Sequence, residues 1–107
     1  MSYLKNTTHL SEILEESNKN PVIIFIYSSQ CGTSHKLLNE LEEGLREKII
    51  SALIYKVTVQ TEPILSQKIE EWFKIKHESP QIIIVNQGKV TYTEHHSKIE
   101  IENFRYR

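Results

Sequence analysis

The strongest constraint on the fold is a run of six consecutive apolar residues from Val22 to Tyr27. The run is rich in β-branched and aromatic side chains, with Pro21 before it and Ser28-Ser29 after it. A strand without alternating polar residues buries both of its faces, which is typical of a strand inside a parallel sheet. The run therefore predicts a central strand that is covered by helices on both sides.

Three helices are predicted from apolar residues that recur at helical spacing. Residues 8–17 and 33–47 each place apolar side chains on one face and charged side chains on the other. A third helix follows Thr61, whose hydroxyl we expect to cap it. On this third helix we expect Trp72 and Phe73 to be core residues.

Three further strands are predicted from β-rich runs over 52–59, 81–85 and 90–93. A tight turn that includes Gly88 separates the last two, so we expect them to pair as an antiparallel hairpin. Beyond the hairpin, a capping-box spacing that begins at Ser97 predicts a short final helix.

The elements follow the order α-β-α-β-α-β-β-α. The first two strands are separated by a helix and should be parallel, with a right-handed crossover between them. The order predicts an α/β fold of the thioredoxin-like kind, in which helices flank a four-stranded mixed sheet. We expect residues 1–107 to form one domain, since a chain of 107 residues leaves no room for a second core.

Charge and cysteine content exclude several classes of function. The chain has 13 Lys and Arg against 14 Asp and Glu, so it lacks the basic surplus of a protein that binds nucleic acid. One cysteine excludes an internal disulfide and a cysteine-only metal site within the chain. With no leader sequence and no apolar run near the ~20 residues that span a bilayer, we expect a cytoplasmic protein without a membrane partner.

The position of Cys31 predicts a reactive thiol. Cys31 follows the central strand and directly precedes the second helix. A helix N-terminus presents free N–H groups and the positive end of the helix dipole, and both favour thiolate over thiol. Small polar residues surround Cys31, whereas a structural cysteine more often lies within an apolar run. We therefore expect the pKa of the Cys31 thiol to be lowered.

Cys31, Gly32, Thr33 and Ser34 form a C-x-x-S motif. In dithiol redox proteins, the residue three positions after the attacking cysteine is the resolving cysteine. Ser34 has a similar size and keeps a hydrogen-bond donor, but it cannot form a disulfide. A protein with one thiol can still exchange disulfides if an outside thiol resolves its mixed disulfide.

A second motif, Ser79-Pro80, stands directly before a predicted core strand. Proline is unusual there because it removes a donor from the strand ladder. In thioredoxin-like folds, a cis-proline at this point lies beside the reactive cysteine, and the backbone of the preceding residue receives the substrate chain. We expect a cis bond before Pro80, with an ordinary trans bond as the alternative.

With these motifs in place, the sequence resembles the monothiol bacilliredoxins, which are thioredoxin-like proteins of bacteria that use the small thiol bacillithiol. The resemblance covers nearly the whole chain. It rests on the C-x-x-S motif, on Tyr-Lys-Val-Thr-Val-Gln-Thr over 55–61 and above all on His-Glu-Ser-Pro-Gln over 77–81. It implies a thiol–disulfide oxidoreductase that removes bacillithiol from S-bacillithiolated client proteins. Bacillithiol would be a co-substrate, no cofactor would be bound, and bacillithiol or a partner redoxin would regenerate the thiol.

The resemblance also assigns roles to individual residues. Cys31 matches the nucleophile of the family, Ser34 its non-resolving position and Pro80 its cis-proline. The family commonly has proline after the cysteine, and this chain has Gly32 instead. That difference could change the reactivity of the thiol or the choice of client.

Four further residues near the two motifs are candidates for binding the substrate or small thiol. Gln30 directly precedes the cysteine. His35 either supports the thiolate or contacts a carboxylate of bacillithiol, or it points into solvent. His77 and Glu78 border the proline loop, where they either line a groove for the small thiol or belong to a simple solvated loop.

Two other functions are compatible with the sequence. The segment 31–34 also resembles the Cys-Gly-Phe-Ser of monothiol glutaredoxins, which hold a [2Fe–2S] cluster between two subunits, although Thr33 replaces the aromatic residue. A redox-inactive adaptor or stress protein that kept the fold is the third function, and Gly32 is its main support. A metal site is not expected, because the adjacent His95 and His96 would point apart on a strand.

Overall fold

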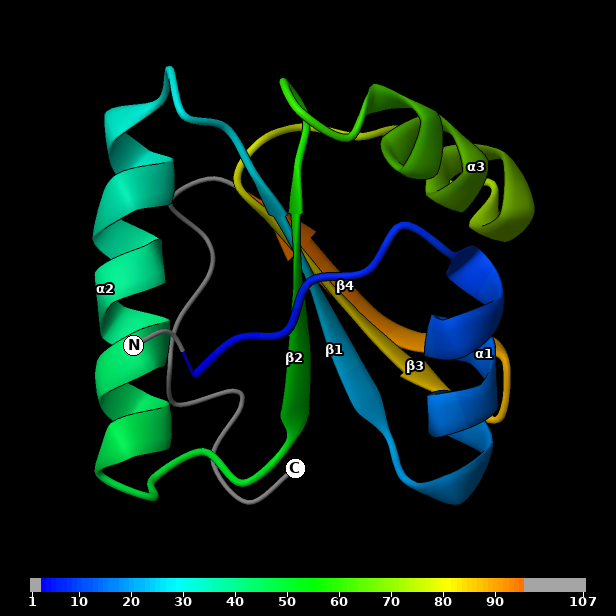
Figure 1. Ribbon diagram of the computed structural model, residues 1–107, viewed down its shortest axis with the longest axis horizontal. Helices are drawn as coiled ribbons and strands as arrows, with labels where there is room; N and C mark the ends of the chain where they lie inside the picture. The colour runs from blue at the N-terminus through cyan, green and yellow to red at the C-terminus, as the bar shows by residue number, and fades with distance from the viewer. Residues whose placement is uncertain (1–2, 96–107) are drawn as a thin grey trace.

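The computed structural model describes residues 3–95, which form one sheet between two layers of helices (Figure 1). The elements in chain order are α1 (Leu10–Lys19), β1 (Val22–Tyr27), α2 (Gly32–Arg46), β2 (Leu53–Thr58), α3 (Pro63–Phe73), β3 (Gln81–Asn86) and β4 (Lys89–His95). The helix expected from Ser97 onward lies outside the described residues.

The strands are arranged in the order β2-β1-β3-β4. Strand β1 runs parallel to β2 and antiparallel to β3, and β3 and β4 form an antiparallel hairpin. The four-stranded mixed sheet predicted from the order of the elements is confirmed. Outside β2, Lys5 makes an isolated bridge to Tyr55, so the segment before α1 lies along the outer edge of that strand.

Strand β1 is the centre of the core, and all six of its side chains are buried. Its alternate residues face opposite layers. Ile23 and Phe25 pack against the buried side of α2, while Ile24 and Ile26 pack against α1 and α3 (Figure 1). Each large apolar side chain that is removed from water in this way contributes roughly 1.5–3 kcal/mol. This burial fixes the end of β1, and hence the start of the chain segment that carries Cys31.

The expectation that Trp72 is a core residue is wrong. Its side chain is 60% exposed, whereas Phe73 packs against the core as expected. The buried side of α3 is centred on Ile69, and Trp72 falls on the flank of the helix beside Lys68. There Trp72 borders a shallow hollow of about 270 Å³ that Leu10 of α1 also lines.

Thr61 does not cap α3. The residue before the first turn is Glu62, and no side chain caps the helix. The Glu62 carboxylate turns back instead and accepts a hydrogen bond from the Thr58 N–H at 3.3 Å. The Thr61 N–H donates to the carbonyl of Thr58 at 3.2 Å, which shows that Thr61 belongs to the turn between β2 and α3.

Candidate active site around Cys31

Cys31 lies where β1 gives way to α2, at the end of the sheet to which the parallel strands point (Figure 1). It is the N-cap residue of α2 and has extended backbone angles, φ −118° and ψ 119°. Its N–H donates to the Ser28 carbonyl at 3.3 Å, and its own carbonyl accepts from the His35 N–H at 3.2 Å. The side chain is partly exposed, so the sulfur lies within reach of a substrate.

The fold brings the two predicted motifs together across 48 residues of sequence. The Cys31 sulfur lies 4.0 Å from the carbonyl oxygen of Ser79. The Ser79–Pro80 peptide bond is cis, as expected, and Pro80 is buried directly before β3. The cysteine and the proline loop therefore form one site.

The first turn of α2 lowers the pKa of the Cys31 thiol. The largest cause is hydrogen bonding from the backbone N–H of Ser34, while partial burial of the sulfur opposes it. The Ser34 hydroxyl and the N–H and hydroxyl of Thr33 lower the pKa further. These N–H groups have no partner within the helix, so they are free to stabilise a thiolate.

Ser34 is a fully buried member of this site. Its hydroxyl oxygen accepts a hydrogen bond from the Ser28 backbone N–H at 3.3 Å. Because that bond uses only a lone pair of the oxygen, the hydroxyl proton stays available to the Cys31 sulfur. The residue that cannot resolve a disulfide is thus placed to stabilise the thiolate.

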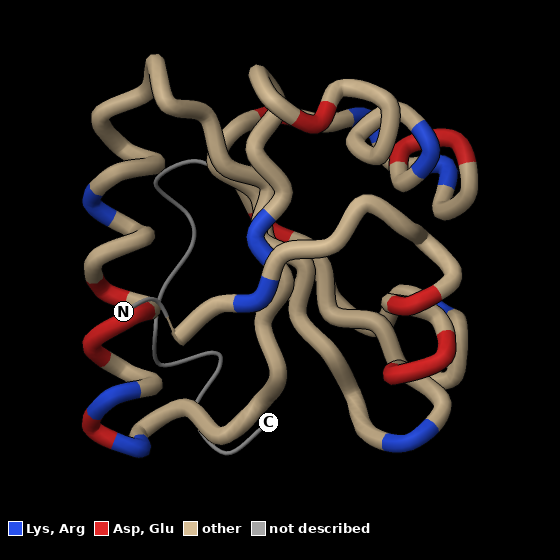
Figure 2. Tube along the Cα trace, in the orientation of Figure 1, with Lys and Arg blue, Asp and Glu red and all other residues tan. Residues whose placement is uncertain are grey.

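The Cys31 thiolate is stabilised by dipoles, and not by a charged side chain from the segment around the cysteine. No Lys, Arg, Asp or Glu occurs between residues 22 and 35, and Figure 2 shows the turn between β1 and α2 without charged residues. The first charged residue of α2 is Lys36. The thiolate environment is therefore built from backbone N–H and hydroxyl groups.

The turn before Cys31 is held by a residue from another loop, Gln60. The Gln60 Oε1 accepts from the Ser29 N–H at 3.0 Å, and its Nε2 donates to the Ser28 hydroxyl at 2.8 Å. The same hydroxyl also accepts from the N–H of Gln30 at 3.2 Å. No role for Gln60 follows from the sequence, although its position after the second parallel strand places it at the same end of the sheet as Cys31.

His35 is exposed, yet its ring is held by β1 and the turn that follows it. Its Nε2 lies 3.1 Å from the Ser29 carbonyl, and its Nδ1 lies 2.9 Å from the hydroxyl of Tyr27. A carbonyl can only accept, so Nε2 donates to it, and in the neutral imidazole Nδ1 is then an acceptor for the tyrosine hydroxyl. His35 therefore braces the turn as well as facing solvent.

His77 packs against α3 beside the proline loop. Its backbone N–H donates to the Glu70 carboxylate at 2.8 Å, and its Nδ1 lies 2.9 Å from the Ser66 hydroxyl. Burial lowers the pKa of the His77 imidazole, against the opposing effect of the nearby Glu70 charge. The neighbouring Glu78 pairs with His95 of β4 at 3.1 Å. These two residues tie the proline loop to α3 and to β4.

Three residues of the candidate site flank Cys31 in the sequence and lie at the surface. Gln30, Gly32 and Thr33 are exposed. Gly32 has open space where a side chain would begin. Because Cys31 is itself partly exposed, a second molecule can approach it.

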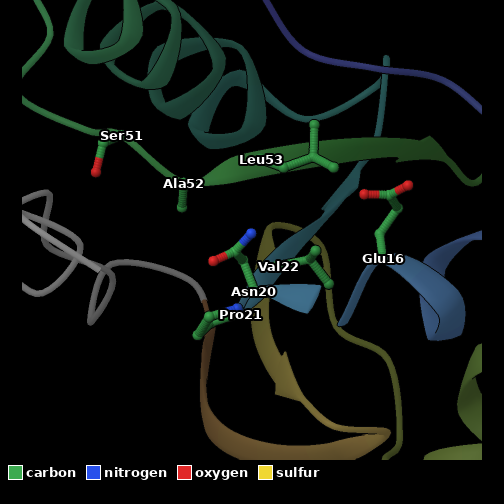
Figure 3. A pocket seen from close by; sticks show the side chains of 7 residues that line it. All are labelled: Glu16, Asn20, Pro21, Val22, Ser51, Ala52 and Leu53. Atoms are coloured by element: carbon green, nitrogen blue, oxygen red, sulfur yellow. The ribbon is translucent and has the colours of Figure 1, made fainter. Parts of the chain in front are cut away.

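A separate hollow of about 350 Å³ lies where β1 and β2 begin (Figure 3). Its lining residues are Glu16, Asn20, Pro21, Val22, Ser51, Ala52 and Leu53. Cys31 follows the other end of β1, so this hollow lies at the opposite end of the sheet and is not part of the cysteine site.

Residues 3–95 contain neither a membrane span nor a cluster of metal ligands. No helix among these residues is long and apolar enough to cross a bilayer. Nor does this part of the chain bring three or more His, Cys, Asp or Glu side chains together as a metal ion would require.

Comparison with known families decides where the chain belongs. The sequence model of the family described as monothiol bacilliredoxin BrxC matches residues 2–104. The chain belongs to the monothiol bacilliredoxin family. Membership of that family, together with the fold, makes it a thioredoxin-like protein of thiol–disulfide redox chemistry.

Solved structures show the same fold. A candidate oxidoreductase with a thioredoxin fold is 23% identical over 94% of this chain and 88% of its own, with a TM-score of 0.80. Thioredoxin from Fasciola hepatica is 17% identical over 89% of this chain and 86% of its own, with a TM-score of 0.66. Thioredoxin O2 from Arabidopsis thaliana is 17% identical over 95% of this chain and 88% of its own, with a TM-score of 0.68. At these identities, the likeness bears on the fold alone.

Proposed function

We propose that this bacilliredoxin-family protein removes bacillithiol from S-bacillithiolated client proteins in the cytoplasm, with Cys31 as its nucleophile. The observation that carries the proposal is the position of the Cys31 sulfur. Cys31 is the partly exposed N-cap residue of α2, and its sulfur lies 4.0 Å from the Ser79 carbonyl beside Pro80. A lowered thiol pKa keeps more of the sulfur in the reactive thiolate form near neutral pH.

The exchange proceeds in two steps. In the first, the Cys31 thiolate attacks the bacillithiol sulfur of the client's mixed disulfide, and a new sulfur–sulfur bond forms as the old one breaks. The client cysteine leaves as a thiolate and takes up a proton from water. In the second, a free bacillithiol thiolate or the thiolate of a partner redoxin attacks the bacillithiol sulfur on Cys31. This attack releases the Cys31 thiolate and forms a disulfide of two bacillithiols or a mixed disulfide with the redoxin.

The remaining site residues position the reactants in this proposal. The backbone of Ser79, beside Pro80, receives the client segment next to the sulfur. Exposed Gln30 and Thr33 border the space that the bacillithiol moiety occupies. No bound cofactor is needed, since every electron in the exchange comes from a thiol.

The one-cysteine sequence makes the second step depend on an outside thiol. Ser34 occupies the position from which a second thiol would resolve the mixed disulfide. Bacillithiolated Cys31 should therefore accumulate when client is present and free small thiol is withheld.

The test is to incubate the protein with a bacillithiolated client and to measure the masses of both proteins. We expect the client to lose one bacillithiol and the protein to gain one on Cys31, and we expect no transfer to the Cys31→Ser variant. Alkylation by iodoacetamide in a parallel sample reports whether the thiol is accessible. No transfer to a thiol that iodoacetamide readily alkylates would contradict the proposal.

A further inference from the structure

The turn that carries the nucleophile is held by a side chain from a different loop. Gln60 follows β2, whereas Ser28 and Ser29 follow β1, and both loops lie at the same end of the sheet (Figure 1). Both the oxygen and the nitrogen of the Gln60 amide form hydrogen bonds with this turn. Its oxygen accepts from the Ser29 N–H at 3.0 Å and its nitrogen donates to the Ser28 hydroxyl at 2.8 Å.

Ser28 connects that amide to the reactive motif. Its carbonyl accepts from the Cys31 N–H at 3.3 Å, and its N–H donates to the hydroxyl of Ser34 at 3.3 Å. The residue is buried, so its polar groups depend on these protein partners rather than on water. A displacement of Ser28 would therefore move both the backbone of Cys31 and the hydroxyl that faces the sulfur.

We infer that Gln60 is a positioning residue for Cys31, which fixes the turn 28–30 and through Ser28 aligns the first turn of α2 with the sulfur. This inference rests on the proposed exchange chemistry of Cys31. Gln60 acts through Ser28 and Ser29 and makes no contact with the reacting atoms in the role proposed. Its effect is on the fraction of time that Cys31 and Ser34 spend in the arrangement that stabilises the thiolate.

Three side chains at position 60 separate the effect of the two hydrogen bonds from the effect of charge. Glutamine supplies an acceptor and a donor. Glutamate keeps the acceptor for the Ser29 N–H, and the Ser28 hydroxyl can donate to its second oxygen, so Gln60→Glu preserves the links while adding a negative charge. Methionine has a similar length and flexible shape but supplies neither strong group, so Gln60→Met removes both links.

The first readout is hydrogen exchange of the turn. In the Gln60→Met variant, we expect the Ser29 amide to exchange about three- to tenfold faster, which corresponds to the loss of one hydrogen bond of ordinary strength. In the Gln60→Glu variant, we expect the protection of Ser29 to be retained. Gln67→Met is the matched control, because Gln67 is an exposed glutamine of α3 whose side chain donates to Glu71 of the same helix at 3.1 Å.

The second readout is the reactivity of the Cys31 thiol. We expect iodoacetamide to alkylate Cys31 about three- to tenfold more slowly in Gln60→Met than in the parent at pH 7, with the midpoint of the pH profile moved upward. In Gln60→Glu the links persist, and the added charge alone should raise that midpoint, with a salt dependence that Gln60→Met lacks. The kcat for bacillithiol transfer should fall in Gln60→Met with little change in KM, since the residue positions the nucleophile.

A double-variant experiment tests the route through Ser28. The Ser28→Ala variant removes the hydroxyl that Gln60 contacts, so the combined loss in Gln60→Met/Ser28→Ala should be smaller than the product of the two single losses. If the loss in the double variant equals the product of the two single losses, the route from Gln60 through Ser28 is overturned. Unchanged alkylation and unchanged exchange of Ser29 in a folded Gln60→Met protein would overturn the inference itself. Both measurements use iodoacetamide or water as the probe, so they hold whether or not Cys31 accepts bacillithiol.

Discussion

The buried hydroxyl of Ser34 accepts a hydrogen bond from the backbone N–H of Ser28 at 3.3 Å. This contact uses a lone pair of the hydroxyl oxygen and leaves the hydroxyl proton for another acceptor. The partly exposed sulfur of Cys31 is that acceptor in its thiolate form, and the Ser34 hydroxyl lowers the pKa of the Cys31 thiol. Position 34 therefore has a chemical role although it holds no sulfur.

Replacing Ser34 by alanine should weaken the nucleophile. The variant loses the hydroxyl that stabilises the thiolate, so the pKa of Cys31 should rise and alkylation by iodoacetamide at pH 7 should slow by about two- to tenfold. The Ser28 N–H also loses its acceptor, which should cost about 1–3 kcal/mol of unfolding free energy. Ser51→Ala, at the opposite end of the sheet, is the control. An unchanged pH profile of alkylation in Ser34→Ala would show that the hydroxyl does not face the sulfur.

Replacing Ser34 by cysteine should convert the one-thiol site into a two-thiol site. The introduced thiol can attack the Cys31 sulfur of the bacillithiolated intermediate, and this attack releases bacillithiol and leaves a disulfide between Cys31 and the new cysteine. Mass spectrometry should find the internal disulfide in Ser34→Cys and the bacillithiol adduct in the parent protein. Persistence of the adduct in Ser34→Cys would contradict this expectation.

Introducing the proline that the family commonly has at position 32 should stabilise the fold. Gly32 is the first residue of α2, where proline fits well, and open space surrounds the position of its Cβ. Cys31 already has the extended backbone that a following proline requires. Gly32→Pro should therefore raise the unfolding free energy by about 1 kcal/mol, chiefly because it restricts the unfolded chain. Urea denaturation measures this change.

The same variant should leave the thiolate environment in place. The N–H groups that lower the pKa of Cys31 belong to Thr33 and Ser34, so the donor that proline removes at position 32 is not among them. The pH profile of Cys31 alkylation should be the same in Gly32→Pro and in the parent. A large upward move of that profile would show that the Gly32 N–H also faces the sulfur.

His77 should make stability depend on pH. Burial lowers the pKa of its imidazole below the ordinary value of 6.5, so the unfolded chain takes up a proton at a higher pH than the folded chain does. The stability that this histidine preserves is fully present above pH 6.5 and is lost as the pH falls from there through the folded-state pKa. The urea concentration at the unfolding midpoint should therefore decrease as the pH is lowered from 7 to 5.

A substitution of His77 should remove part of that dependence. Glutamine has no titrating group, so His77→Gln should lose less stability between pH 7 and pH 5 than the parent does. His9→Gln, which changes an exposed histidine before α1, is the matched control. Equal slopes in the His77 variant and in the parent would contradict the role assigned to burial.

Much of the fold follows from apolar patterns that are local in the sequence. The uninterrupted run of β1 predicts its burial on both faces, and the helical stripe with Leu37 and Leu41 predicts the buried side of α2. Trp72 shows where this reasoning fails. Hydrophobicity alone does not tell which side of a helix packs on the sheet, and Trp72 lies on the flank of α3.

The candidate site is predicted only in part, for a similar reason. Cys31 and Pro80 are found from their places next to predicted elements, since the topology of such a sheet brings these places together. The link from Gln60 to Ser28 depends on the conformations of two turns, and no periodic pattern reports them. His77 is likewise a polar residue near a motif in the sequence, and only packing shows that its ring contacts Ser66 of α3.

The bridge beside Tyr55 has a consequence for how copies of the protein meet. The Lys5 N–H donates to the Ile54 carbonyl and the Lys5 carbonyl accepts from the Lys56 N–H, both at 2.8 Å. These bonds occupy backbone groups on the outer side of β2, which would otherwise be a template for pairing with another chain. Leu4 is buried next to them, so the covering segment is anchored as well as paired. The segment before α1 thus hinders edge-to-edge aggregation through β2.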